Sequence, residues 1–163
     1  MGRLSVLGLM LTMLCAITSD YASYGASRFS NCSENDLDAL IDFKNGLEDP
    51  ENRLASWKGS NCCQWHGISC DDDTGAIVAI NLGNPYHVVN SDSSGRYGFW
   101  NLSGELRPSL IKLKSLEYLD LSFNTFNDIP IPEFLGSLEN LQYLNLSEAG
   151  FTGVVPCKFR KFT

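Results

Sequence analysis

Cysteines are the residues of this chain whose type and spacing point most directly to chemistry. The adjacent pair Cys62 and Cys63 does not match the Cys-x-x-Cys spacing of zinc sites, so disulfides are favoured over metal ligation. Neighbouring side chains of an extended backbone point apart, and the two thiols should therefore have different partners. We predict disulfides between Cys32 and Cys62 and between Cys63 and Cys70. Cys157 is then left as a free thiol or pairs outside the chain.

The start of the chain has the features of a secretory signal peptide, assigned to residues 1–25. Arg3 provides a positive start, an apolar run follows over residues 4–17, and small residues come next. Cleavage is expected between Ser19 and Ala26, which removes Cys15. The apolar run is too short to span a bilayer comfortably, and no later segment is apolar enough. The mature chain is therefore predicted to be secreted into the extracellular space, where thiols oxidise. A longer product with a transmembrane segment would lie at the plasma membrane.

Other chemistry-bearing residues give weaker signals. Three Asn-x-Ser patterns are predicted glycosylation acceptors, at Asn31, Asn101 and Asn145. The acidic run 71–73 lacks the alternating ligands of a calcium loop, so a solvated turn closed by Gly75 is expected. We find no nucleotide loop, nucleophile elbow or zinc motif, and predict neither an enzyme nor a cofactor or metal site. The net charge of −7 argues against a nucleic-acid partner.

An N-terminal cap, assigned to residues 26–75, is predicted to position these cysteines. Helical spacing and an apolar stripe for the core are indicated by Leu37, Leu40, Ile41, Lys44 and Leu47, with Phe43 beside them. Ser33 and Asp36 resemble a capping box at the helix start, and Gly46 and Pro50 mark its end. A second segment, 53–57, adds Leu54 and Trp57 to the same core. Residues 62–70 are expected to form a disulfide-stapled hairpin that packs Trp65 and Ile68.

The second half of the chain, residues 76–163, is repetitive. Residues 116–126 fit the pattern L-x-x-L-x-L-x-x-N-x-L, and residues 141–151, offset by 25, fit it apart from Ala149. A degenerate copy lies 39 residues upstream of the first, at Ile77, Ile80 and Leu82, so a polar insertion of about residues 85–100 is predicted as an exposed loop. This period is that of leucine-rich repeats.

The physics of such a repeat defines the expected fold. The leucines point inward from a short parallel strand, and the intervening residues point outward. Asn124, at the ninth position, turns the chain while its amide pairs with backbone groups that the turn leaves open. One repeat cannot bury its own apolar face, whereas stacked repeats bury a continuous one. The prediction is an α/β solenoid.

Several of these motifs together resemble a known family. Cys32, the helix and the element Cys62-Cys63-x-Trp65-x-Gly67-Ile68-x-Cys70 look like the N-terminal cap of plant leucine-rich-repeat extracellular proteins. Residues 102–110 and 151–156 are similar to the convex half of the plant-type repeat, and residues 126–138 look most like the receptor-like proteins of plant immunity. The resemblance covers nearly all of residues 30–156. It implies a right-handed solenoid with parallel strands on the concave face behind a disulfide-stapled helical cap.

The resemblance also implies a function. We expect an extracellular recognition module of a receptor-like protein, in defence or developmental signalling, whose partner is a protein or peptide ligand or a co-receptor. One alternative is a secreted inhibitor of polygalacturonases. The family pattern predicts a further leucine and strand after Pro156, where this chain reads Cys157-Lys-Phe-Arg-Lys-Phe-Thr163 with an incomplete last repeat. A truncated product acting as a decoy, or without function, is therefore the third hypothesis.

The expected contact surface consists of outward-facing strand positions. These are Glu117, Tyr118, Asp120, Ser122, Phe123, Gln142, Tyr143, Asn145, Ser147 and Glu148. Tyr118, Phe123 and Tyr143 offer rigid aromatic area at low entropy cost, as binding hot spots often do. The alternative is that these residues only contact solvent and neighbouring strands. A glycan on Asn145 would cover part of the surface.

Overall fold

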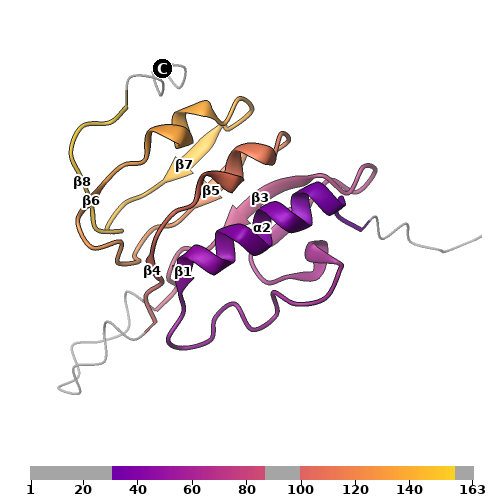
Figure 1. Ribbon diagram of the computed structural model, residues 1–163, viewed down its shortest axis with the longest axis horizontal. Coiled ribbons are helices and arrows are strands. Elements are labelled where there is room, and N and C mark those ends of the chain that lie inside the picture. Colours follow the sequence, from indigo (N-terminus) through magenta and orange to yellow (C-terminus); the bar gives the residue numbers. More distant parts are fainter. Residues whose placement is uncertain (1–30, 87–99, 157–163) are drawn as a thin grey trace, which may run out of the picture.

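The computed structural model describes residues 31–86 and 100–156. The predicted signal peptide, residues 87–99 of the predicted insertion, and Cys157 lie outside this part of the chain. Helix α2 (Glu34–Gly46) comes first, and short strands and 3₁₀ helices follow it along the chain (Figure 1).

Helix α2 begins and ends close to the predicted positions. The Ser33 hydroxyl accepts a 3.1 Å hydrogen bond from the Asp36 amide, which satisfies one of the free N–H groups of the first turn. Near the other end, the Lys44 ammonium donates to the Trp57 carbonyl at 2.9 Å and so ties the helix to the segment that follows it. Its positive charge also lies in the last turn, where the helix dipole favours cations.

The buried face of α2 is narrower than predicted. Ala39, Leu40 and Phe43 are fully buried, whereas Ile41 is 41% exposed. The prediction that Ile41 belongs to the core is therefore wrong. Successive helical residues are rotated by about 100°, so a face that centres on positions 39, 40 and 43 turns position 41 toward solvent.

An aromatic cluster forms the centre of the cap. The Trp57 ring lies 6.5 Å from that of Phe43 and 5.3 Å from that of Trp65, measured between centroids. Each buried indole N–H has a partner 2.9 Å away: Trp57 donates to the His66 carbonyl, and Trp65 donates to the Lys58 carbonyl. The cap thus buries two tryptophans without leaving a polar group unpaired.

Both predicted disulfides are present, Cys32–Cys62 and Cys63–Cys70. The predicted hairpin within residues 62–70 is wrong, because Cys62–Gln64 form a short 3₁₀ helix, η1. Strand β2 (Ile68–Cys70) instead pairs antiparallel with β3 (Ile77–Asn81). The hairpin has its turn in the segment after Cys70, where the turn closed by Gly75 was predicted, and the second disulfide joins η1 to β2.

The turn of that hairpin is the acidic segment after Cys70. The Asp71 carboxylate accepts hydrogen bonds from the Thr74 amide at 2.9 Å and from the Thr74 hydroxyl at 2.6 Å. Gly75 follows with φ of 71°, a value that favours glycine. The prediction of a turn closed by Gly75 is confirmed.

The repeats add parallel strands to β3. The order β2-β3-β5-β7 continues through β5 (Tyr118–Asp120) and β7 (Tyr143–Asn145). Ala79, Tyr118 and Tyr143 lie in register. The inward positions of the first two repeats are at most 2% exposed, namely Ile77, Ile80, Leu82, Leu116, Leu119 and Leu121. The described residues thus form the predicted solenoid, with parallel strands along one side of a continuous leucine core.

The return segments cover the other side of this core. They contain the elements η2 (Pro108–Lys112), η3 (Glu133–Ser137), β6 (Ile129–Pro130) and β8 (Phe151–Thr152). In Figure 1, α2, η2 and η3 lie side by side in chain order, and each contacts the next. β6 and β8 pair in parallel as a second, smaller sheet. The helix of the cap therefore occupies the place that η2 and η3 have in the first two repeats.

The cap and the first return segment meet where two backbones approach closely. Strand β1 (Leu47–Glu48) pairs antiparallel with β4 (Ser103–Gly104). A Cβ atom on Gly104 would overlap the carbonyl oxygen of Gly46, and Gly104 has φ of 96°. Glycine is thus required there by both space and conformation.

Candidate functional site

Two tyrosines stand at the same position of successive repeats on the parallel sheet. The rings of Tyr118 and Tyr143 stack with centroids 4.4 Å apart and planes inclined by 3°. Tyr143 is 44% exposed, while Tyr118 is half-buried. The strand register produces this stack, because Tyr118 and Tyr143 are direct partners of the β5–β7 pair.

Next to the tyrosines, the Asp120 carboxylate accepts hydrogen bonds from several polar groups. One carboxylate oxygen accepts from the Ser122 amide at 2.8 Å and from its hydroxyl at 2.6 Å. The other accepts from the Tyr118 hydroxyl at 3.3 Å and from the Asn145 amide group at 3.1 Å. Four donors thus stabilise a carboxylate that is only 8% exposed, and they hold neighbouring strands in a fixed arrangement.

The same motif recurs one repeat later in neutral form. The Asn145 side-chain oxygen accepts from the Ser147 amide at 3.1 Å and from its hydroxyl at 2.6 Å. Asn145 and Ser147 are also the first and third residues of a predicted glycosylation pattern. A glycan attached to the Asn145 nitrogen would therefore lie beside the contact with Asp120, on the surface that carries the tyrosine stack.

The ten predicted contact residues differ in exposure. Five are exposed: Glu117, Gln142, Tyr143, Ser147 and Glu148. Three are half-buried: Tyr118, Phe123 and Asn145. Asp120 and Ser122 are buried, so the expectation that every intervening position faces solvent is wrong for these two. They hydrogen-bond each other instead and support the exposed residues from beneath. That the exposed members contact a ligand stays a prediction.

Negative charge and hydrogen-bond acceptors dominate this surface. Glu117 and Glu148 are exposed, Asp120 lies beneath them, and none of the ten positions carries a lysine or arginine. Burial of the ring, followed by the neighbouring Asp120 carboxylate, raises the pKa of Tyr118. Its hydroxyl therefore remains protonated at neutral pH and keeps its role as a donor. We call the set Glu117, Tyr118, Asp120, Tyr143 and Asn145 the concave row.

Asn124 forms the predicted hydrogen bonds of the repeat turn. Its amide nitrogen donates to the carbonyls of Leu121, Leu82 and Ser122 at 2.8, 2.9 and 3.2 Å. Its oxygen accepts from the Leu102 amide at 2.9 Å. The side chain is 3% exposed, so it satisfies buried backbone groups of two adjacent repeats at once.

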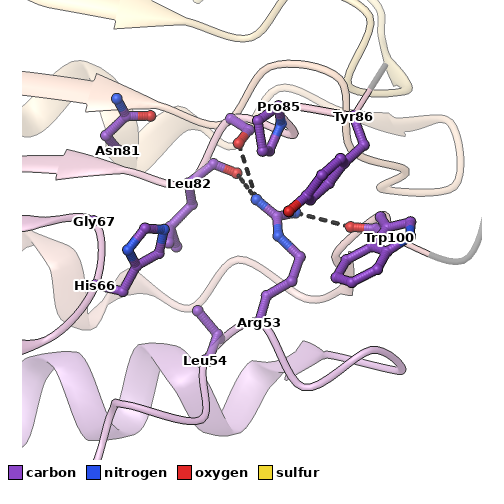
Figure 2. A pocket seen from close by; sticks show the side chains of 10 residues that line it. Arg53, Leu54, His66, Gly67, Asn81, Leu82, Pro85, Tyr86 and Trp100 are labelled. Carbon is purple, nitrogen blue, oxygen red and sulfur yellow. Dashed lines mark hydrogen bonds between the residues drawn. The ribbon is translucent and has the colours of Figure 1, made fainter. Parts of the chain in front are cut away.

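Arg53, a residue of the cap, extends this network. Its guanidinium donates from one nitrogen to the Trp100 carbonyl and to the Asn124 side-chain oxygen, and from the other to the carbonyls of Leu82 and Gly83, all at 2.9 Å. Figure 2 shows the guanidinium inserted among these carbonyls. The cap therefore supplies the donors that close the turn of the first repeat.

Arg53 was not identified from the sequence, although a signal exists. Pro85 precedes Asn124 by 39 residues, the same offset that separates the two leucine patterns, so the first repeat has proline where an asparagine is expected. Proline has no side-chain hydrogen-bond donor, so the backbone carbonyls of that turn need a donor from another residue. A positive side chain elsewhere in the cap could have been sought on that ground.

Residues 31–86 and 100–156 contain no cluster of three histidine, cysteine or acidic side chains that could hold a metal ion. In the same ranges, none of the helices combines the length and the apolar character needed to cross a bilayer.

Family comparisons agree with the two halves of this architecture. Residues 33–71 match the family described as Leucine rich repeat N-terminal domain. Residues 115–138 and 140–162 each match the family described as Leucine Rich Repeat. The chain is therefore a leucine-rich-repeat protein. Its N-terminal domain contains the helix and the Cys63–Cys70 disulfide, and the Cys32–Cys62 disulfide joins it to the residue just before it.

Individual relatives narrow the class. Receptor-like protein EIX1 of Solanum lycopersicum is 42% identical over 136 residues, which are 81% of this chain and 13% of that protein. The BIR2 ectodomain of Arabidopsis thaliana has a TM-score of 0.63 at 28% identity, covering 82% of this chain and 64% of that one. The Arabidopsis receptor kinase HAESA, solved with the peptide hormone IDA and the co-receptor SERK1, has a TM-score of 0.62 at 28% identity. The match covers 80% of this chain and 20% of the HAESA chain.

These matches identify the family. The chain belongs to the plant leucine-rich-repeat family of receptor-like proteins, and it spans only about an eighth of the length of the curated relative EIX1. The chain is thus similar to plant receptor-like proteins and to the ectodomain of a plant receptor kinase.

Proposed function

We propose that this chain is an extracellular recognition module that binds a peptide or protein ligand through the concave row, as part of defence or developmental signalling. The observation that carries the proposal is the stack of Tyr118 on Tyr143, held beside the Asp120–Asn145 hydrogen bond. Paired rings and a fixed carboxylate lose little conformational entropy on binding, which favours affinity.

The chemistry of the concave row limits the ligand. The stacked tyrosine rings accept apolar or positively charged groups on their free faces. Asp120 and Glu117 of the row add negative charge, as does Glu148 one repeat on. A ligand segment with a basic or hydroxyl-rich side chain beside an apolar one would match this surface. The relative HAESA is solved with a peptide hormone, and an extended peptide is the ligand form that a row of parallel strands can follow.

The test is a selection of displayed peptides on the folded, secreted chain. Random peptides are panned on the unchanged protein, and the affinities of the enriched sequences are then measured on Tyr143→Ala. We expect a loss of at least about tenfold, because a truncated hot-spot aromatic typically costs more than about 1.4 kcal/mol. Enrichment of basic residues in the peptides is also expected.

Ile111→Ala provides the matched control. The exposed fraction of Ile111, 38%, is similar to the 44% of Tyr143. Ile111 lies on η2, however, on the other side of the core. Affinity should be unchanged in this variant. Peptides that bind Tyr143→Ala as tightly as the unchanged chain, or that lose affinity in Ile111→Ala instead, would refute the concave row as the binding surface.

A further inference from the structure

A pocket lies where the cap meets strand β3. This pocket has a volume of about 430 Å³, within the range of roughly 300–1,000 Å³ that is typical of small-molecule sites. Arg53, His66, Asn81, Tyr86 and Trp100 contribute to its walls (Figure 2). Asn81 pairs with Asp120 in the β3–β5 register, so the pocket borders the concave row but shares none of its residues.

Two aromatic rings form one wall of the pocket. Tyr86 and Trp100 pack against each other with centroids 4.6 Å apart, and they are 49% and 37% exposed. The backbone on each side is anchored, because the Tyr86 amide donates to Asn84 and the Trp100 carbonyl accepts from Arg53, both at 2.9 Å. An exposed aromatic pair with a fixed backbone is a preorganised binding platform.

The charge of Arg53 does not make this an anion site. Each terminal guanidinium nitrogen carries two N–H groups, and each makes two hydrogen bonds to protein oxygens. An anionic ligand would have to displace these bonds, and the whole chain carries a net charge of −7. A cationic ligand would meet the guanidinium itself. A neutral ligand is therefore favoured.

Hydrogen-bonding groups occupy the opposite wall. Within residues 31–86 and 100–156, the hydrogen bonds of His66 involve its backbone carbonyl and amide, and those of Asn81 involve its backbone. The imidazole and the side-chain amide therefore keep their donors and acceptors for a ligand. Both residues are exposed. Aromatic faces on one side and amide and imidazole groups on the other match a molecule that has apolar faces and a rim of hydroxyls.

From these contacts we propose that the pocket binds a sugar ring of a neutral oligosaccharide. The C–H groups on one face of a pyranose would pack on Trp100 and Tyr86, whose ring faces carry partial negative charge. The sugar hydroxyls would exchange hydrogen bonds with His66 and Asn81. This site is independent of the concave row, so either proposal can fail without the other.

The native tryptophans make the test direct. Trp57 and Trp65 are each 3% exposed, so of the three tryptophans in the chain Trp100 is the one that a quencher in solution reaches. Cellohexaose, xylohexaose and chitohexaose are titrated separately into the full chain, up to about 10 mM, with acrylamide quenching and calorimetry as readouts. At least one of them should bind and protect Trp100 from quenching. A linear hexagalacturonate should bind at least about tenfold more weakly than that sugar.

Substitutions locate the binding. Trp100→Ala should weaken it at least about tenfold, and His66→Ala about threefold, since each removes side-chain contacts but leaves the anchoring backbone bonds. Tyr143→Ala, in the concave row, should leave it unchanged. The proposal is overturned if the folded chain, with its disulfides intact, binds none of the neutral probes. It is also overturned if it prefers the hexagalacturonate, or if the sugar binds Trp100→Ala and His66→Ala undiminished.

Discussion

The second and third repeats have nearly the same sequence pattern but differ in how well their cores are covered. Leu119 and Leu121 are 0% exposed, whereas Leu144 and Leu146, one repeat later, are only partly buried. β5 has a hydrogen-bonded strand on each side, and β7 has one on its β5 side within the described residues. The burial of a leucine at a given repeat position therefore depends on the neighbouring strands and not on the motif alone.

The polar contacts of the two repeats differ in the same direction. Asn124 satisfies buried backbone groups and accepts from Arg53, while Ala149 stands at the corresponding position of the third repeat. Ala149 is buried and has no side-chain polar group. The turn of the second repeat is therefore stabilised by buried polar contacts, one of them with the cap, and the corresponding turn position of the third repeat has no such side-chain contact.

The first prediction uses one leucine from each repeat. Leu119→Ala should lower the free energy of unfolding by about 4 kcal/mol, because it removes a fully buried side chain and leaves a cavity. Leu144→Ala should cost about 2 kcal/mol or less, since part of that side chain already contacts water. Equilibrium denaturation, followed by circular dichroism, measures both variants against the unchanged chain. Equal losses would mean that the third repeat is as well buried as the second.

The second prediction tests the polar difference. Asn124→Ala should cost about 2–3 kcal/mol, because the carbonyls of Leu82 and Leu121 lose a buried donor and Arg53 loses an acceptor. Asn124→Asp keeps an acceptor for Arg53 but loses the amide donors, so it separates the two contributions. The same denaturation experiment measures these variants.

Asn140→Ala is the control for the second prediction. Asn140 also donates to a backbone carbonyl, that of Lys114 at 2.6 Å, but it is exposed and water can replace the bond. Its loss should cost less than about 1 kcal/mol. If Asn140→Ala destabilises the chain as much as Asn124→Ala, burial is not what makes the Asn124 contacts strong.

The sequence predicted features that depend on local periodicity. The 25-residue offset of the leucines located strands β5 and β7, and the serine before the acidic first turn located the start of α2. Cysteine spacing predicted both disulfides. The strands and the helix start are encoded by residues that lie near one another in the chain or in equivalent repeats. The Cys32–Cys62 disulfide joins residues 30 positions apart, and it could be predicted because cysteine is the residue type that forms such a bond.

Features that depend on distant contacts were missed or wrongly placed. Arg53 acts on carbonyls 29 and 30 residues away, and no motif marks that pairing. Asp120 is buried where it accepts a cross-strand hydrogen bond from Asn145, and Ser122 is buried where it donates to Asp120; alternation along one strand reveals neither contact. The hairpin was placed within residues 62–70 because the disulfide spacing suggested it, whereas the register with β3 determines the pairing.

The third prediction concerns the smallest effect and compares two similar turns. Asp71 in the cap accepts from the amide and hydroxyl of Thr74, as Asn145 in the third repeat accepts from the amide and hydroxyl of Ser147. Only the cap version carries charge. The Thr74 hydroxyl, followed by the Thr74 amide, lowers the pKa of Asp71 below its ordinary value of 3.8. Its stabilisation is therefore fully present above pH 3.8 and is lost as the pH falls through the lower folded value.

Carboxyl-carbon NMR titration of the full chain measures this pKa directly. Thr74→Val removes the hydroxyl donor, so the pKa of Asp71 should rise toward 3.8, while Thr74→Ser keeps a hydroxyl and should leave the pKa low. Asp71 is exposed, and solvent screening keeps the effect on stability small, so the pKa is the sensitive readout. A low pKa that survives in Thr74→Val would assign the shift to the backbone amides of the turn. In that case the two turns would differ in charge but not in the contribution of their hydroxyl groups.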